Sequence, residues 1–269
     1  MTAPPPGDEN KSIKAAETTF SILELLSERG ACRLTDIATE LGYSKSTMHY
    51  YLKTLERKRY VVEADGQYHL GLRLLHLGGS SLSRFGAYRV AVESANDLSS
   101  QTGELAQVVL EEEGMGYFVY QSHGDDDFDA PFHIGDERPL HSNAYGKAIL
   151  AFLSRESVLD VIDRHGLERY TDRTITDPDS LFAELEKIRE RRLAFDDQEQ
   201  YDGVRSVASP ILLDDSQPVG ALGVTGGIDI DTIYRNDRMK ARRFANEAPE
   251  VVRRTAHLIG NTLSERGVQ

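Results

Sequence analysis

The sequence has a single cysteine, Cys32, among its 269 residues. One thiol excludes an intramolecular disulfide and any metal site built from several thiolates. The chain also lacks an apolar run long enough to cross a bilayer. Residues 1–11 are polar and proline-rich, without the apolar segment that a secretory signal contains. We therefore expect a cytoplasmic protein that makes no contact with a membrane, and we expect residues 1–11 to form a disordered arm.

The sequence also lacks the common signatures of an enzyme. It contains no G-x-S-x-G nucleophile motif, and Gly146-Lys-Ala148 is not preceded by the upstream glycine of a phosphate-binding loop. Asp196, Asp197 and Glu199 are candidates for acid–base chemistry, but neighbouring residues of a strand partly face opposite sides of the sheet. We therefore expect neither catalysis nor a cofactor.

Positive charge is scarce over the chain as a whole, and its distribution is uneven. The net charge is −13, from 31 Lys or Arg and 44 Asp or Glu. Residues 1–70 carry nine cations and ten anions, whereas the remaining 199 residues carry 22 and 34. Within 45–59, five cations face one glutamate, a local excess that is typical of a nucleic-acid contact, although it also suits a solvated helix face. An acidic chain with more Arg than Lys further suggests adaptation to high salt.

Three short helices are predicted near the beginning of the chain. Apolar residues recur at helical spacing over 12–28 and again over 34–41, where Gly42 ends the second helix. Ser44 is suited to cap a third helix that runs to about Arg59. Two short helices joined by a glycine-containing turn are typical of a helix-turn-helix, in which the second helix enters the DNA major groove.

The third helix has one apolar face and one polar face. Met48, Leu52 and Leu55 are expected to be buried, and the opposite face is rich in hydrogen-bonding groups. Alternating residues around Asp65-Gly66 then predict a β-hairpin, which would be the wing of a winged helix. An alternative is that Ser44 and Thr47 only cap this helix and that the other polar side chains of the face are solvated surface. The candidate DNA-binding residues on the polar face are Lys45, Ser46, Thr47, His49, Tyr50 and Lys53.

The rest of the chain predicts a mixed α/β domain. An apolar-striped stretch begins at residue 72, and Gly78-Gly79 interrupts it, so we place a domain boundary nearby. A helix over 85–101 follows. Beyond it, we expect strands over 104–112, 116–122, 194–198, 206–213 and 218–225, and helices over 142–153, 156–165, 178–192 and 237–263.

An ordered set of short motifs resembles the IclR family of transcription regulators. In the first part these motifs are Leu41-Gly-Tyr-Ser-Lys-Ser-Thr47, Leu52-Lys-Thr-Leu55, Tyr60-Val and Tyr68-His-Leu-Gly71. In the second part they are Thr102-Gly-Glu104, Pro139-Leu-His141, Ala144-Tyr-Gly-Lys-Ala148, Thr174-Ile-Thr-Asp177, Ala194-Phe-Asp-Asp197, Glu199, Gly203 and Ala208-Ser-Pro-Ile211. The resemblance covers the chain from about Lys11 onward.

The resemblance implies a two-domain α/β protein. Its parts would be a winged helix-turn-helix at 12–71, a linker helix at 72–84 and a GAF-like α+β effector-binding domain at 85–269. Two positions depart from the family pattern. Tyr50 stands where arginine is often found, and Arg59 stands where glycine commonly ends the recognition helix. Arg59 could therefore contribute a phosphate contact, or the helix could end differently.

The resemblance also implies where an effector would bind. The start of the helix near 143–146 would offer backbone N–H groups to an anion, and side chains on three strands could orient ligand hydroxyl groups. A structural interpretation is also open, in which Gly146 serves packing, Asp196 caps a turn or pairs with an arginine, and Thr225 is an ordinary strand residue. The implied effector-binding residues are Ala144, Tyr145, Asp196, Val204, Ser206, Gly223 and Thr225.

Together these features predict a sequence-specific regulator of transcription whose affinity for a double-stranded DNA operator responds to a small effector. The resemblance implies an effector from carbon metabolism (an organic acid, an aromatic acid, a sugar or a sugar acid) and assembly as a dimer or a dimer of dimers. The alternatives are an effector-independent regulator and a metal-responsive one. A metal would use His123, His133, His141 and the run Asp125–Asp127, although their spacing matches no known ligand motif and we expect no metal site.

Overall fold

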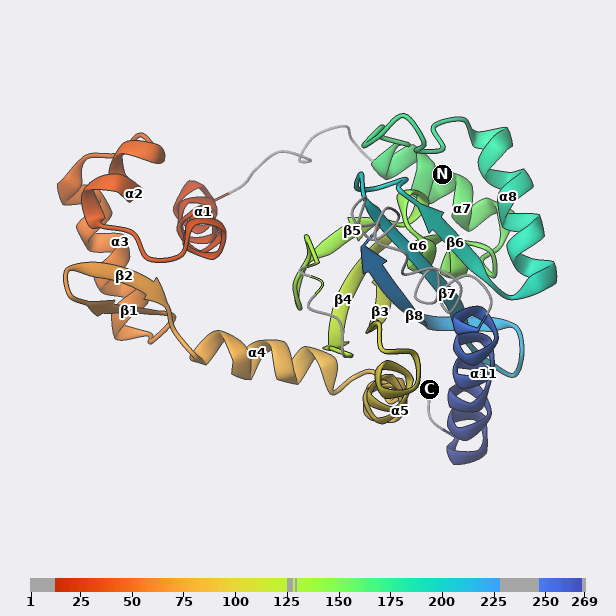
Figure 1. Ribbon diagram of the computed structural model, residues 1–269. Coiled ribbons are helices and arrows are strands. Elements are labelled where there is room, and N and C mark those ends of the chain that lie inside the picture. The colour runs from red at the N-terminus through yellow and green to blue at the C-terminus, as the bar shows by residue number, and fades with distance from the viewer. Residues whose placement is uncertain (1–12, 125–127, 129, 228–246, 268–269) are drawn as a thin grey trace, which may run out of the picture. The chain divides into compact units, whose positions relative to one another are not determined.

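The computed structural model describes residues 13–124, 128, 130–227 and 247–267 of the chain. The chain divides into two compact units, Met1–Arg84 and Phe85–Gln269, which are considered separately below (Figure 1). Each unit has its own buried apolar core.

Three helices form the core of the first unit. They are α1 (Lys14–Arg29), α2 (Leu34–Glu40) and α3 (Lys45–Arg57). All three predicted helices are thus confirmed within a few residues. The predicted buried face of α3 is also confirmed, because Met48, Leu52 and Leu55 pack with Ile22, Leu26 and Ile37 of the other two helices.

The predicted hairpin follows α3. Strands β1 (Val61–Ala64) and β2 (Gln67–Leu70) pair antiparallel, with Ala64 opposite Gln67. Asp65 and Gly66 lie between them with φ of 52° and 74°, the left-handed values that a two-residue type I′ turn requires. Cys32 adds an isolated bridge to Tyr68 of β2 and is buried. The unit is therefore a winged helix-turn-helix.

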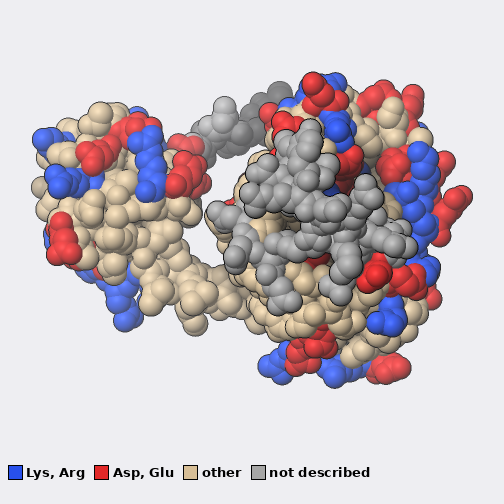
Figure 2. Space-filling model, in the orientation of Figure 1, with Lys and Arg blue, Asp and Glu red and all other residues tan. Residues whose placement is uncertain are grey.

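Helix α4 (Arg73–Leu82) continues without a break through Gly78-Gly79. The expected interruption is therefore wrong. Each glycine in a helix interior disfavours the helix by about 1 kcal/mol relative to alanine, and here the other residues of the helix outweigh that cost. None of its residues is buried, and Leu72 and Leu75 are 87% and 73% exposed. The α4 segment is tan over nearly all of its visible surface in Figure 2, so its exposed face is largely uncharged.

A six-stranded antiparallel sheet organises the second unit. Its strand order is β5-β4-β3-β8-β7-β6, so β8, the last strand in the described part of the chain, lies beside β3 in the middle of the sheet. The strands are β3 (Leu105–Glu112), β4 (Met115–Ser122), β5 (Glu137–Pro139), β6 (Ala194–Asp197), β7 (Val204–Leu213) and β8 (Gln217–Gly227).

Helices cover the two faces of this sheet (Figure 1). One face carries the short helices η1 (Leu140–Ser142) and α6 (Ala144–Leu150), with α7 (Arg155–His165) and α8 (Pro178–Arg191) outside them. The other face carries α5 (Ala87–Thr102) and α11 (Ala248–Arg266), which contact each other and strands β3, β7 and β8. The predicted two-domain fold with a C-terminal α+β domain is confirmed. The final helix begins at Ala248 among the described residues, and positions 237–246 of the prediction lie outside them.

Candidate functional site

The exposed face of α3 carries most of the candidate DNA-binding residues. Ser44 caps the helix, since its Oγ accepts the backbone N–H of Thr47 at 3.1 Å. The same Oγ also lies 2.9 Å from the hydroxyl oxygens of both Ser46 and Thr47. The capping of the helix by Ser44 therefore leaves its neighbours at the surface, because Ser46 remains exposed and Thr47 is only half-buried.

The remaining side chains of that face point into solvent. Lys45 and His49 are exposed, and Tyr50 is 75% exposed although it is aromatic. Lys53 is exposed and pairs with Glu56 at 2.9 Å. An exposed pair of this kind contributes little to stability, so a DNA phosphate could compete for the lysine.

Arg59 follows the end of α3 in the left-handed conformation, with φ of 63°. Its N–H donates to Glu56 O at 2.8 Å, and the N–H of Tyr60 donates to Leu55 O at 3.0 Å. These bonds end the helix in the way that a glycine at this position would. The arginine is exposed at the start of the turn into β1 and is not part of the polar face of α3.

Four polar side chains meet beneath α6, a group that we name the Gln107 cluster: Gln107, Tyr145, Ser206 and Thr225. Tyr145 and Thr225 both donate to Gln107 Oε1, at 3.0 and 2.8 Å. Ser206 Oγ lies 2.9 Å from Thr225 Oγ1, and the hydroxyl of Tyr145 lies 3.0 Å from that same atom. All four side chains are at most 3% exposed. Three candidate effector residues are thus joined in one network.

Gln107 itself was missed by sequence reasoning. It lies within the apolar run of β3, pairs with Gly223 across the ladder and is fully buried. Its Nε2 has no hydrogen-bond acceptor among the described residues. A polar residue inside an otherwise apolar central strand was the one signal that could have identified it, because buried polar groups almost always have partners.

The other predicted effector residues surround this cluster without joining its hydrogen bonds. Asp196 is opposite Ser206 in the β6–β7 ladder, and Gly223 is opposite Gln107. Val204, the first residue of β7, pairs with Gly227, the last residue of β8, and Ala144 belongs to the apolar core.

The start of α6 offers fewer free backbone N–H groups to a ligand than we expected from the sequence. Asn143 caps the helix, because its Oδ1 accepts the N–H of Gly146 at 2.8 Å. A Cβ at Gly146 would lie only 2.2 Å from Leu140 O, so the glycine permits close packing of the chain. The packing interpretation of Gly146 is therefore confirmed, and the hydroxyl and amide groups of the Gln107 cluster are the stronger candidates for holding a ligand.

A second buried polar group lies at the end of β6. The Lys147 ammonium contacts the Glu199 carboxylate, and the two side chains are 1% and 13% exposed. Asp196 accepts the N–H of Glu199 at 2.7 Å, so it caps this turn. Burial raises the pKa of Asp196 to about 7, and burial also raises the pKa of Glu199. Asp196 therefore holds its proton to a higher pH than an exposed aspartate does.

Replacing Asp196 with asparagine is expected to remove part of the pH dependence of stability. The folded pKa of about 7 exceeds the unfolded value of 3.8. The folded state therefore holds the proton more tightly, and wild-type stability falls as pH rises through this window. The stability of Asp196→Asn relative to the wild type should increase by a few kcal/mol, roughly, between pH ~4 and ~8, measured by urea unfolding. Asp197→Asn, on the exposed neighbour, is the matched variant with which the size of this change is compared. A constant difference across this range would contradict the assignment.

The histidines considered as metal ligands form no ligand set in the part of the chain that the structure describes. His141 is buried, its Nε2 lies 2.9 Å from Glu168 O, and burial lowers its pKa. Among the described residues, no group of three or more His, Cys, Asp or Glu side chains is placed to hold a metal ion. The run Asp125–Asp127 lies outside those residues.

No helix among the described residues has both the length and the apolar character needed to cross a bilayer.

Comparison with known families matches both units of the chain. Residues 15–65 match the IclR helix-turn-helix domain, and residues 79–258 match the C-terminal domain of the bacterial transcriptional regulator IclR.

Similar proteins agree with these matches. The glycerol operon regulatory protein of Streptomyces coelicolor is 35% identical over 226 residues, which are 81% of this chain and 87% of that protein. The IclR structure of Thermotoga maritima aligns with a TM-score of 0.75 and 27% identity, over 94% of this chain and all of that one. An IclR homologue of Microbacterium hydrocarbonoxydans, in complex with 4-hydroxybenzoate, shares the fold with a TM-score of 0.74 and 20% identity, over 94% and 100% of the two chains. The chain therefore belongs to the IclR family of transcriptional regulators, which are not enzymes.

Proposed function

We propose that the second unit binds a small metabolite at the Gln107 cluster and that this ligand changes the affinity of the regulator for its operator. The observation that carries the proposal is the buried Gln107 Nε2, which has no acceptor among the described residues although the hydroxyl groups of Tyr145 and Thr225 both donate to the oxygen of the same amide. An unsatisfied buried donor costs about 1–3 kcal/mol. An acceptor on a ligand would satisfy it.

The chemistry of the cluster favours a ligand with hydroxyl or carboxyl groups. Its hydrogen-bonding groups are neutral, and the nearby Lys147 is already paired with Glu199. We therefore propose an organic acid, an aromatic acid, a sugar or a sugar acid from carbon metabolism. Two similar proteins support this class, one named for the glycerol operon and one in complex with 4-hydroxybenzoate. The proposed contacts are Ala144, Tyr145, Asp196, Val204, Ser206, Gly223 and Thr225, with Gln107 added.

For the first unit, we propose that α3 enters the major groove of a double-stranded operator in the cytoplasm. Its polar face is exposed and its apolar face is buried, as a groove-reading helix requires. Short hydroxyl side chains and His49 suit base edges, and lysines suit phosphates. The proposed contacts are Lys45, Ser46, Thr47, His49, Tyr50 and Lys53, with Arg59 directed to a phosphate.

We further propose that α4 joins two copies of the chain. Leu75, Gly78, Gly79 and Leu82 recur at the i, i+3, i+4 and i+7 positions of one helix face, and no residue of α4 is buried. Small residues at the centre of such a face let a partner helix approach closely. A two-fold dimer would present two recognition helices to a two-fold operator, and a pair of dimers would form the larger assembly.

The proposed mechanism is a population shift. A ligand that binds one arrangement of the assembly better than another would stabilise that arrangement. A coupling free energy of about 1–3 kcal/mol would change operator affinity about 5- to 150-fold.

The test is a screen of the full-length protein for ligand-induced thermal stabilisation, followed by operator titrations with the ligand found. Thr225→Val keeps the side-chain shape and removes the hydroxyl at the centre of the cluster, so ligand affinity should fall about tenfold or more. Thr262→Val, the same change on α11, should leave ligand affinity unchanged. Lys45→Ala should weaken operator binding and leave ligand binding intact.

The outcomes separate the proposed sensor from its alternatives. Operator affinity that stays constant at saturating ligand would contradict the mechanism. A flat screen on well-folded protein would favour an effector-independent regulator. Stabilisation by divalent cations alone would favour a metal-responsive one. Equal loss of both activities in Lys45→Ala would indicate misfolding.

A further inference from the structure

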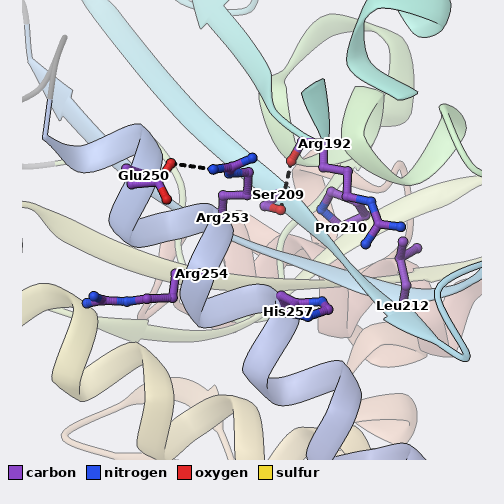
Figure 3. A pocket seen from close by; sticks show the side chains of 8 residues that line it. All are labelled: Arg192, Ser209, Pro210, Leu212, Glu250, Arg253, Arg254 and His257. Carbon is purple, nitrogen blue, oxygen red and sulfur yellow. Dashed lines mark hydrogen bonds and ion pairs between the residues drawn. The ribbon is translucent and has the colours of Figure 1, made fainter. Parts of the chain in front are cut away.

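A cavity lies between α11 and β7, on the opposite face of the sheet from the Gln107 cluster (Figure 3). Its volume is about 340 Å³, within the range of sites that hold small molecules. Ser209, Pro210 and Leu212 of β7 form one side. The other lining residues are Arg192, Glu250, Arg253, Arg254 and His257.

The lining is cationic although the chain as a whole is acidic. Residues 71–269 carry 22 Lys or Arg and 34 Asp or Glu, a net of −12. In the cavity, three arginines and a histidine accompany one glutamate. Four of these side chains share one face of α11 because positions 250, 253, 254 and 257 follow helical spacing. The reversal of charge is therefore local and is produced by one helix face together with Arg192.

Arg192 approaches from the other side of the cavity. It ends α8 in the left-handed conformation, with φ of 55°, and its carbonyl accepts the hydroxyl of Ser209 at 2.8 Å. Figure 3 shows Ser209 and Pro210 between Arg192 and the side chains of α11. The backbone of Arg192 is thus held against β7, and its side chain reaches the mouth of the cavity from a different element than Arg253 does.

The present partners of these cations are exposed and exchangeable. Arg253 pairs with Glu250 at 2.6 Å, and Arg192 pairs with Asp215 at 2.8 Å, with both carboxylates more than 60% exposed. Exposed pairs of this kind contribute little to stability, so an anionic ligand can replace the carboxylates. Arg254 contacts only the amide oxygen of Gln101, at 3.5 Å, and has no carboxylate within ion-pair distance among the described residues.

We propose that this cavity is a second ligand site, which takes a small metabolite with two or more negative charges. Guanidinium groups bind carboxylate and phosphate oxygens through paired hydrogen bonds, and two of them on different elements can hold two acidic groups of one ligand. Pro210 and Leu212 offer an apolar surface to the carbon skeleton between those groups. Such a ligand would connect α11 to β7 and to the end of α8. The site is separate from the Gln107 cluster and does not rest on the function proposed for it.

The experiment is isothermal titration calorimetry of the full-length protein at low chloride concentration, with citrate and, in a separate titration, with inorganic pyrophosphate. We expect saturable binding of at least one probe at one site per chain. Binding of citrate but not pyrophosphate would indicate a carboxylated ligand, and binding of pyrophosphate but not citrate would indicate a phosphorylated one. Binding of each probe in its own titration would indicate general recognition of polyanions. No saturable binding of either probe would overturn the proposal.

Variants locate the site. Arg253→Gln and Arg192→Gln should each lower the affinity about tenfold, because each removes a charge-assisted pair of hydrogen bonds. Arg266→Gln is the matched control, since this residue lies at the exposed end of α11 outside the cavity. Unchanged affinity in both cavity variants would place the anion elsewhere, for example on the basic strip of α3, and would overturn the assignment. Far-ultraviolet circular dichroism and the unliganded Tm would establish that both variants are folded.

Discussion

Replacing Lys147 with methionine is expected to destabilise the second unit by about 3–5 kcal/mol, because the Glu199 carboxylate would remain buried without its cation. Lys147 is 1% exposed and contacts Glu199 across 52 positions of sequence. Glu199 also anchors a loop, since its carbonyl accepts the hydroxyl groups of Thr171 and Thr174 at 3.2 and 2.6 Å. Loss of the ion pair between Lys147 and Glu199 should therefore also loosen the turn that Asp196 caps.

A double-mutant cycle is the control for this prediction. Lys147→Met combined with Glu199→Leu removes both charges, and its stability should recover most of the loss, because apolar replacements of a buried pair are often neutral. Urea unfolding, followed by a probe in the second unit, gives the free energies. A single variant that loses less than about 1 kcal/mol would show that water reaches the carboxylate and that the pair is not buried in solution.

Replacing Leu75 with lysine is expected to convert the proposed dimer into monomers and to lower operator affinity about 100-fold or more, because two linked recognition helices gain affinity by avidity. Leu75 is 73% exposed on the apolar face of α4, one helical turn before Gly78 and Gly79. A lysine there would place a charge where the proposed partner helix packs. Light scattering during gel filtration gives the mass, and fluorescence anisotropy gives the operator affinity.

Ser80→Lys is the matched control. Ser80 is exposed on α4 and lies away from the leucine face, with its hydroxyl bonded to His76 O at 3.0 Å. This variant should stay dimeric and bind the operator normally. A Leu75→Lys protein that remains dimeric would contradict the assignment of α4 as the interface, and the contact would then have to be sought in the second unit.

Local features of this protein follow directly from its sequence. Apolar spacing located the helices of the first unit, Ser44 marked the start of α3, and Asp65-Gly66 marked the hairpin turn. Each of these depends on residues within a few positions of one another, where backbone geometry and capping decide the outcome. Ordered motifs along the whole chain similarly indicated the family.

Long-range features could not be obtained in this way. The bond between Gln107 and Thr225 joins residues 118 positions apart, and it exists because β8 inserts between β3 and β7. The same strand order places Asp196, Ser206 and Thr225 in one row across the sheet. The charge reversal in the α11 cavity likewise depends on which helix face meets β7. Sequence periodicity specifies which face of an element is apolar, but the partner of that face is selected by the packing of the whole domain.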